Sequence, residues 1–507
     1  MKYIVDGKEM KQIDTYTIQK IGIESLVLME RAALETIKVI KKIVGKQDKI
    51  LVVCGTGNNG GDGIAIGRIL YEKGCHVQIL CLGNIEKQTV ETKRQYEIAK
   101  RISVSVKTDW KEIQWNSYDF IVDAIFGIGL AREVSGEYAK VIELINQSRA
   151  KVAAVDIPSG IHAGTGEVMG IAIRADLTVT FGYQKLGLVF YPGREYAGRV
   201  KVADIGFPQI AMKQCRPKSF YFTERDLEKL PMRKRDGNKG TFGKILVIAG
   251  TKNISGAAYF AAKAAYRTGA GLVKVFTVQE NRNILQTLLP EALFQDYDIE
   301  NYGEQTEEVL FENLKWADAV VIGPGMGLHK VSEQILKFVL KHAESSIVLD
   351  ADAIHLLKKT EQWNKKEFVT PVIITPHLKE MSVLTDKSVR EIKKELIDTA
   401  QKQAEQNKNL FVVLKDAVTV VSNGTEHYVN LSGNNGMATG GSGDVLTGII
   451  AALLAQGNKP FTAASLGVYI HGLSGDISSN EKGYYGVVAD DLIDHIPKVL
   501  KQKRRRA

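Results

Sequence analysis

Short apolar runs rich in β-branched residues recur along the chain, and amphipathic stretches separate them. In the first half these runs are 49–54, 76–80, 120–123 and 152–156. In the second half they are 244–250, 319–323, 347–350, 372–375 and 410–415. Runs of this length, spaced by about 10 to 20 helix-forming residues, are typical of buried strands in βαβ units. The pattern predicts an α/β fold with parallel sheets, whose strands carry binding groups at their carboxyl ends.

Between the two series the periodic pattern breaks down. This stretch contains Pro208, Pro217 and Pro231, followed by the charged run 232–239. Prolines and solvated charges interrupt regular structure and are typical of connections at the surface. With 507 residues the chain is also long enough for more than one core. We therefore expect one α/β domain over 1–215, a surface connector over 216–239 and a second α/β domain over 240–507.

Composition limits the class of protein. The chain is 44% hydrophobic and 25% charged, and no run reaches the roughly 18 uncharged apolar residues that a membrane helix needs. The four cysteines have no metal-binding spacing, which predicts reduced, mostly buried thiols in a cytoplasmic protein. Five positive charges of the net +9 lie in the last seven residues, 501–507, and are interpreted as a solvated basic tail. Neither a membrane nor a nucleic acid is expected as a partner.

A glycine-rich segment follows the first strand. Gly55, Gly57 and Gly60 have the spacing G-x-G-x-x-G, and an apolar helix is expected from Ile64. Glycines before a helix let backbone N–H groups approach a phosphate, as in Rossmann-like three-layer domains. The acidic residue that would bind a ribose after the second strand is missing from 77–83. An ordinary dehydrogenase is therefore disfavoured.

Amide and carboxylate groups follow three strands of this first sheet. One group is the run Asn58-Asn59-Gly60-Gly61-Asp62, and Asp123 and Asp156 end two further strands. The run alone has a simpler interpretation, in which Asn and Gly form a turn and Asp62 caps the helix. Three polar strand ends at one edge of a sheet instead favour a binding site.

Together these motifs resemble the NAD(P)H-hydrate epimerase domain over roughly residues 1–215. The resemblance implies that the following residues contact the hydrated dinucleotide: Asn58, Asn59, Gly60, Gly61, Asp62, Gly127, Ile128, Gly129, Leu130, Ala131, Arg132, Glu133 and Asp156. It also implies a potassium ion bound by oxygens of Asn59, Asp123 and Ser159. The substrates would be NADH hydrate and NADPH hydrate.

Asp156 is the candidate acid/base of this first site. The hydrate is a carbinolamine at C6 of the nicotinamide ring, so inverting it requires a group that moves a proton while the C–O bond or the ring opens and closes. An alternative is that Asp156 only orients its loop or balances a cation.

A second glycine-rich segment, 434–448, leads into an apolar helix and contains Gly440-Gly441-Ser442-Gly443-Asp444. Closely spaced glycines before a helix form an anion hole of backbone N–H groups, which the helix dipole reinforces. Asp444 is expected in the first turn, where it can accept the proton of a hydroxyl that attacks a terminal phosphate. The alternative is an acid that only complements the helix dipole.

This arrangement resembles the ribokinase-like superfamily. The motifs 240–243, 250–258, 323–327, 349–353, 374–377 and 414–419 resemble its NAD(P)H-hydrate dehydratase branch in order, over about 220–500. The resemblance implies that Ala258, Gly325, His377 and Asp444 bind the hydrate. It implies a phosphate donor bound by Lys415, Asp416, Ala417, Val418, Thr419, Asn434, Asn435, Gly436, Met437, Ala438, Thr439, Gly440, Gly441, Ser442 and Gly443.

The residues leave some roles of the second site open. Lys415 is placed to neutralise phosphate, or is a surface lysine beside a turn. His377 taken alone is a structural histidine, and Asp350 and Asp352 could touch Mg²⁺ or only fix loops. The fused arrangement resembles the type that uses ADP, so ADP with Mg²⁺ is expected.

The resemblance predicts a bifunctional repair enzyme, with catalytic Asp156 and Asp444, that epimerises the hydrate and dehydrates its S form. Homo-oligomers are expected on the same ground. One alternative is a vitamin-type kinase, which would release a stable phosphorylated product. Another makes the first domain a nucleotide-binding or partner-recruiting module without catalysis.

Overall fold

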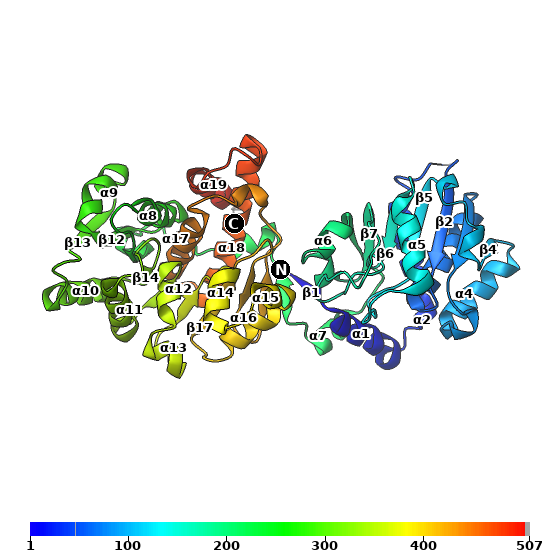
Figure 1. The fold of residues 1–507 in the computed structure, drawn as a ribbon, viewed down its shortest axis with the longest axis horizontal. Coiled ribbons are helices and arrows are strands. Elements are labelled where there is room, and N and C mark those ends of the chain that lie inside the picture. Colours follow the sequence, from blue (N-terminus) through cyan, green and yellow to red (C-terminus); the bar gives the residue numbers. More distant parts are fainter. Residues whose placement is uncertain (46, 502–507) are drawn as a thin grey trace. The chain divides into compact units, whose positions relative to one another are not determined.

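The computed structural model describes residues 1–45 and 47–501, and these form two compact units. The N-terminal unit is Tyr3–Lys218, and the C-terminal unit consists of Met1–Lys2 and the chain from Ser219 onward (Figure 1). Of the expected basic tail, 502–507 lie outside the described residues.

The N-terminal unit contains a seven-stranded sheet in which all neighbouring strands run parallel. In spatial order its strands are β4 (Ser105–Lys107), β3 (His76–Cys81), β2 (Lys49–Cys54), β5 (Phe120–Ala124), β6 (Lys151–Val155), β7 (Leu177–Phe181) and β9 (Arg199–Ala203). The runs predicted at 49–54, 76–80, 120–123 and 152–156 are confirmed as β2, β3, β5 and β6. Separately, β1 (Lys2–Val5) pairs in parallel with β8 (Gln184–Lys185).

Helices cover both faces of this sheet, which confirms the three-layer prediction. The helices of the unit are α1 (Gly7–Tyr16), α2 (Ser25–Ile40), α3 (Asn58–Glu72), α4 (Val90–Arg101), α5 (Gly136–Gln147), α6 (Gly193–Tyr196) and α7 (Gln209–Cys215). One apolar core joins α2, α3 and α4 to the sheet, and a second joins α5 to the opposite face.

The glycine-rich helix begins earlier than the sequence suggested. Helix α3 starts at Asn58, with Gly57 as its N-cap, so the run 58–62 forms its first turns and does not precede a helix at Ile64. Close packing explains the early start, because a Cβ at Gly60 would lie 2.0 Å from the carbonyl oxygen of Gly55. Asp62 is the fifth residue of the helix and does not cap it, contrary to the simpler interpretation.

The sheet of the C-terminal unit is larger and mostly parallel. In spatial order its strands are β13 (Leu293–Tyr297), β12 (Leu272–Val278), β11 (Lys244–Ile248), β14 (Ala319–Ile322), β15 (Ser346–Leu349), β16 (Val372–Ile374), β17 (Leu410–Leu414), β18 (Val420–Ser422), β19 (His427–Val429) and β10 (Ser219–Tyr221). The five predicted runs are confirmed as parallel strands β11, β14, β15, β16 and β17. The antiparallel pairs of β18 with β17 and β19 were not predicted.

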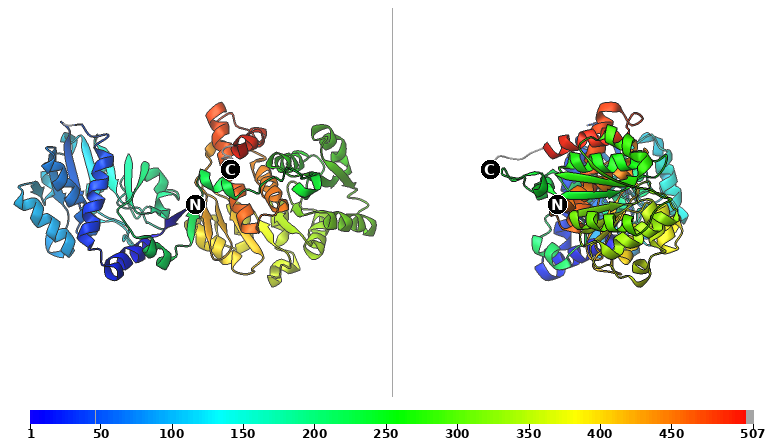
Figure 2. Two further views of the ribbon diagram at one scale, coloured as in Figure 1. Left: turned by 180° about the vertical axis from the view of Figure 1, so that it is seen from behind. Right: turned by 90° about the vertical axis from the view of Figure 1, so that its left-hand side faces the viewer.

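Helices lie on both sides of this sheet (Figure 2). They are α8 (Gly256–Thr268), α9 (Arg282–Leu288), α10 (Glu304–Trp316), α11 (Lys330–His342), α12 (Asp352–Leu357), α13 (Glu361–Lys365), α14 (Leu378–Thr385), α15 (Val389–Lys394), α16 (Leu396–Ala404), α17 (Ser442–Ala455), α18 (Pro460–Lys482) and α19 (Ala489–Lys501). Helix α17 packs on α8, α18 and strands β14 and β15. A Cβ at Gly448 would lie 2.1 Å from the carbonyl oxygen of Ala261, so glycine allows α17 and α8 to approach closely.

The segment 216–239 differs from the expected surface connector. Strand β10 within it pairs in parallel with β19, and Phe220, Phe222 and Leu227 are buried. Alternating aromatic residues fit a strand on an apolar face, and Phe222 and Tyr428 have ring centroids 4.6 Å apart. The longest exposed stretch of the segment is the charged run 232–236.

Two compositional predictions can be compared with the fold. All four cysteines are free thiols, with Cys54 and Cys81 buried and Cys75 and Cys215 partly exposed. Within residues 1–45 and 47–501, no helix is long and apolar enough to cross a membrane.

The order of strands fixes where each unit can bind a ligand. From β2 the chain passes first to β3, which lies on one side of β2 in the sheet, and later to β5, which lies on the other side. In the C-terminal unit, β11 lies between β12 and β14 in the same way. In open parallel sheets the crevice forms at the carboxyl ends beside such a reversal of strand order. The polar strand ends predicted above lie at these two edges.

Candidate functional site

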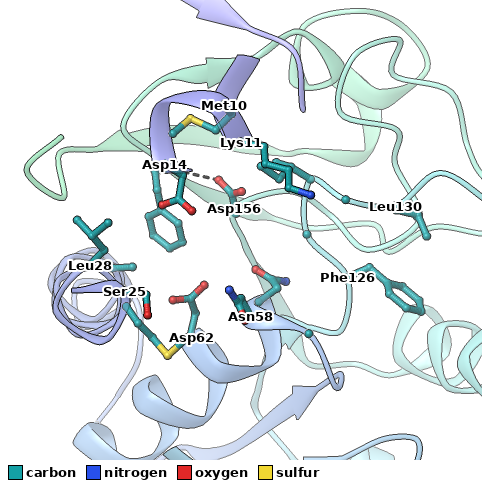
Figure 3. A pocket seen from close by; sticks show the side chains of 18 of the residues that line it. Met10, Lys11, Asp14, Ser25, Leu28, Asn58, Asp62, Phe126, Leu130 and Asp156 are labelled. Atoms are coloured by element: carbon teal, nitrogen blue, oxygen red, sulfur yellow. Dashed lines mark hydrogen bonds between the residues drawn. The ribbon is translucent and has the colours of Figure 1, made fainter. Parts of the chain in front are cut away.

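The N-terminal unit has a cavity of about 710 Å³ at this edge of its sheet (Figure 3). Of the predicted substrate-binding residues, those that line it are Asn58, Asn59, Asp62, Gly127, Ile128, Gly129, Leu130, Ala131, Arg132 and Asp156. Gly60 and Gly61 instead pack behind the wall, against Gly55 and Met29, and Glu133 is exposed. The cavity volume is in the range of small-molecule sites.

Asp156 is fixed by a hydrogen-bond network at the end of β6. Its backbone φ is +66°, a left-handed conformation that non-glycine residues seldom adopt and that aims the side chain back toward β7. Its Oδ1 accepts hydrogen bonds from Lys185 Nζ at 2.5 Å, Thr180 Oγ1 at 3.0 Å and Phe181 N at 3.1 Å. These three bonds all go to one carboxylate oxygen.

Lys185 is a site residue that the sequence prediction missed. Its side chain is fully buried, and Nζ also donates to Thr180 Oγ1 and to the Phe181 carbonyl oxygen, both at 2.9 Å. A buried ammonium requires a counter-charge and hydrogen-bond acceptors, and the three acceptors here satisfy all three of its protons. The sequence signal for this residue was a lysine in the otherwise apolar run 185–190, but this signal does not identify Asp156 as the partner of the lysine.

A second network joins the ends of β5 and β6. Asp123 is completely buried; its Oδ1 accepts from Ser159 Oγ at 2.6 Å, and its Oδ2 accepts from Ser159 N at 2.8 Å. Ser159 Oγ in turn accepts from Phe126 N at 2.8 Å. Burial raises the pKa of Asp123 to about 6, although the bonds from Ser159 oppose the shift. Asn59 packs against the same loop at Gly127, and its buried Nδ2 has no hydrogen-bond partner within the described chain.

The cavity also contains two carboxyl groups that face Asp156. Asp62 on α3 and Asp14 on α1 both line it (Figure 3). Burial, followed by repulsion from Asp156 and Asp14, raises the pKa of Asp62 well above its ordinary value. Burial and repulsion from Asp156 also raise the pKa of Asp14. Asp14 was not predicted from the sequence.

In the C-terminal unit, Asp444 lies in the first turn of α17, as predicted. The N-cap of α17, Gly441, has φ +87°, and a Cβ there would lie 2.6 Å from the Phe260 ring, so this turn requires glycine. Burial and repulsion from Asp350 raise the pKa of Asp444 to about 7, and Lys415 opposes the shift.

Lys415 is no surface lysine, because it pairs with Asp350. Its Nζ donates to Asp350 Oδ1 at 2.8 Å, and a Cβ added to Gly443 would lie 3.3 Å from the same Nζ. Burial alone would lower the pKa of Lys415, but Asp350 and Glu380 outweigh it and raise this pKa. The lysine therefore places a fixed positive charge beside the predicted anion hole.

The sequence analysis assigned no role to Asp350, but in the structure its carboxylate joins the loops at this edge of the sheet. It is 2% exposed; its Oδ1 also accepts from Thr375 Oγ1 and its Oδ2 from Thr447 Oγ1, both at 2.8 Å. Burial alone would raise the pKa of Asp350, but Lys415 and the two hydroxyls hold it below its ordinary value. Asp352 accepts from Gly327 N at 2.8 Å and fixes that loop.

The remaining predicted residues of this unit have mixed placements. His377 caps α14 through a reciprocal pair of bonds with Glu380 and is half exposed. Ala258 is fully buried in α8, so its side chain lies away from any ligand. Gly325 has φ +59° and packs on Ile254. In the segment 415–419, Val418 is buried and Ala417 exposed.

Helix α18 holds the predicted donor-binding loop from one side. Asp476 accepts from Gly433 N at 3.0 Å and from Asn434 Nδ2 at 2.9 Å. Asn434 Oδ1 accepts from Gly436 N at 3.0 Å and from Ser479 Oγ at 2.6 Å. These bonds fix the backbone that leads into the turn at Gly440–Gly443, so its N–H groups are preorganised for an anion.

Comparisons with known proteins give matches for both units. Residues 25–187 match the family model described as YjeF-related protein N-terminus, and residues 245–498 match NAD(P)H-hydrate dehydratase. The bifunctional NAD(P)H-hydrate repair enzyme Nnr of Thermofilum pendens is 36% identical, with 98% of this chain and 96% of the relative covered. The enzyme of that name from Moorella thermoacetica is 35% identical over 98% of this chain and 97% of its own length.

A solved structure supports the fold of the second half. A ribokinase-like superfamily protein from Enterococcus faecalis matches with a TM-score of 0.50 and 30% identity, covering 56% of this chain and 96% of its own.

The buried pair at Asp156 leads to a prediction about stability. Lys185→Met should leave the Asp156 carboxylate buried without its counter-charge and lower the free energy of unfolding of the N-terminal unit by about 3 kcal/mol. Lys201→Met, on the exposed side of β9, is the matched control and should change it by about 0.5 kcal/mol or less. Denaturant unfolding of the full chain measures both. Equal stability of the two variants would contradict a buried ion pair.

Proposed function

Since the chain belongs to the family of bifunctional NAD(P)H-hydrate repair enzymes, which epimerise and dehydrate NAD(P)H hydrates, we propose that its N-terminal unit performs the epimerisation and its C-terminal unit the dehydration. Two observations support this division. The cavity with Asp156, Asp62 and Lys185 offers groups for proton transfer, and an epimerisation by proton transfer needs no phosphate donor. The turn before α17 offers an anion hole beside Lys415 and Asp444. Family membership disfavours the vitamin-type kinase.

In the proposed epimerisation, Asp156 is the base. Its Oδ1 is engaged by Lys185, Thr180 and Phe181, and Oδ2 has no hydrogen-bond partner among the described residues. The free oxygen can accept the proton of the C6 hydroxyl, while the fixed oxygen keeps the carboxylate oriented. The loop Gly127–Arg132 and Asn58 would surround the dinucleotide, with Arg132 near its phosphates.

A potassium ion fits the donors around Asp123. Oxygens of Asp123 and Ser159 lie together. The side-chain Nδ2 of Asn59 is buried without a hydrogen-bond partner among the described residues, and turning this amide by half a turn would place its oxygen there in exchange for the nitrogen. Hard oxygen donors suit such a cation. When bound, the ion would supply positive charge near Asp123 and the substrate. Asn59, Asp123 and Ser159 would hold it.

In the proposed dehydration, Asp444 removes the proton of the C6 hydroxyl as that oxygen attacks the terminal phosphate of the donor. Backbone N–H groups of the turn 440–443 and the ammonium of Lys415 stabilise the charge of the transferred group. The nitrogen lone pair then expels phosphate from C6, and loss of a C5 proton restores the dihydropyridine. Phosphorylation thus converts hydroxide, a poor leaving group, into a good one.

We propose ADP as the donor, which gives AMP and phosphate. Mg²⁺ would enter with the donor's phosphates, since it is commonly held by phosphate oxygens and water with few protein ligands. When bound, it would supply charge neutralisation at those phosphates. Cytoplasmic location suits the four free thiols, and a homo-oligomer is proposed from the family alone.

Recovery of absorbance at 340 nm tests the two activities together. A mixture of both epimers of NADH hydrate, with ADP, Mg²⁺ and K⁺, should be converted almost completely to NADH. Asp444→Asn should lower this rate by about 1,000-fold or more, because the attacking hydroxyl loses its base. ATP in place of ADP and a mixture without nucleotide are the controls. Recovery that stops at the share of one epimer would contradict the epimerase, and no recovery would contradict the dehydratase.

The pH dependence follows from Asp444. The base form is required, and the pKa of this group is raised to about 7, so kcat/KM for dehydration of the S epimer should rise as the pH increases through about 7. Initial rates at 340 nm from pH 5.5 to 8.5 measure it. A profile without a limb near pH 7 in the wild-type enzyme would contradict the assignment of Asp444 as base.

Potassium binding should be visible as stability of the N-terminal unit. Replacing tetramethylammonium by K⁺ should raise the unfolding temperature of the wild-type chain, because a ligand that binds only the folded state stabilises it. Ser159→Ala should reduce this shift, and Ser148→Ala, outside the cavity, should retain it. Calorimetry measures the shift; an equal effect of K⁺ on both variants would contradict the site.

A further inference from the structure

We propose that Asp62 is the proton donor of the epimerisation and acts on the ring nitrogen across the cavity from Asp156. This inference rests on the epimerase activity proposed above. It goes further by assigning the second half of the proton transfer, for which Asp156 alone is insufficient.

The position of Asp62 separates it from the other acids of this edge. It is the fifth residue of α3, and its side chain lines the cavity together with Asp14 and Asp156 (Figure 3). Asp123 is bound by Ser159, and Asp156 by Lys185. Within residues 1–45 and 47–501 the Asp62 carboxyl has no hydrogen-bond partner. It is thus free to contact a ligand.

Charge balance decides the protonation state of Asp62. Three carboxyl groups, Asp14, Asp62 and Asp156, share the cavity wall, and the one buried ammonium, Lys185, is committed to Asp156. An unpaired carboxylate in such surroundings retains its proton in preference to its charge. In agreement, burial and the two neighbouring carboxylates raise the pKa of Asp62 well above its ordinary value, and Lys185 only partly opposes this.

Among the described residues, the other elements around the cavity supply no buried cation that reverses this balance. Strand β2 contributes the thiol of Cys54, whose pKa is itself raised by burial and by Asp62 among others. Glu91 on α4 acts on Asp14 and adds negative charge. Lys11 on α1 and Arg132 in the loop after β5 line the cavity but are exposed to solvent, where their fields are screened.

A neutral acid opposite an ionised base matches the chemistry of a carbinolamine. Asp156 takes the proton of the C6 hydroxyl, the C6=O bond forms and the C6–N1 bond breaks with its electron pair moving to N1. Asp62 gives its proton to N1, which is conjugated with the ring carboxamide. Rotation about C5–C6 presents the other face of the aldehyde; N1 then attacks C6, Asp62 recovers the proton from N1 and Asp156 returns its proton to oxygen. Both groups end in their initial states.

Asp62→Asn tests the assignment, because the amide keeps the size of the side chain and a hydrogen-bond donor but has no acidic proton. Exchange between purified epimers of NADH hydrate is followed by chromatography without nucleotide, after subtraction of the rate without protein. We expect kcat to fall by about 100-fold or more while KM changes by less than about threefold. Glu143→Gln, an exposed change of the same kind on α5, should leave both parameters unaltered.

The pH profile supplies a second readout that a purely structural role would not change. Wild-type kcat should fall as the pH rises through the raised pKa of Asp62, and the residual activity of Asp62→Asn should lack this limb. Unchanged kcat in Asp62→Asn, or loss of the limb in Asp14→Asn instead, would overturn the proposal. Absence of exchange in the wild-type enzyme would instead refute the epimerase function itself.

Discussion

A buried ammonium–carboxylate pair lies at the carboxyl edge of each sheet, and the surrounding loops depend on it. In the N-terminal unit Lys185 donates to Asp156 at 2.5 Å, and in the C-terminal unit Lys415 donates to Asp350 at 2.8 Å. Removing two charges from water costs several kcal/mol per ion, so such pairs persist only where further hydrogen bonds complete them. Threonine hydroxyls do so in both units, from Thr180 in the first and from Thr375 and Thr447 in the second.

The two pairs also determine which carboxyl groups remain available for proton transfer. Each lysine is committed to one aspartate, so Asp62 in the first unit and Asp444 in the second have no ion-pair partner of their own among the described residues. Burial therefore raises the pKa of Asp62 well above its ordinary value and that of Asp444 to about 7. In the proposed mechanisms both edges therefore share one division, between a charge that is committed to positioning the loops and an acid that is free to move a proton.

The strands and the position of Asp444 could be predicted because they follow from local patterns, namely apolar runs and glycines before a helix. Three features could not. The early start of α3 depends on Gly60 packing against the backbone of Gly55, β10 depends on pairing with β19 over a long stretch of sequence, and Lys185 depends on a partner 29 residues away. Each depends on tertiary contacts that periodicity does not encode. The same holds for Asp350, whose role appears only with Lys415 beside it.

The two proposed mechanisms require opposite protonation states at one pH. The proposed phosphoryl transfer needs Asp444 without its proton, whereas the proposed ring opening needs Asp62 with its proton. An ordinary aspartate would be ionised at neutral pH and would fit only the first requirement. Burial raises the pKa of Asp444 to about 7, so a neutral solution contains its ionised form, whereas burial and two neighbouring carboxylates raise the pKa of Asp62 well above its ordinary value, which favours its protonated form. Since a stereospecific dehydratase accepts one epimer, this overlap lets the other epimer be converted under the conditions in which the first is consumed.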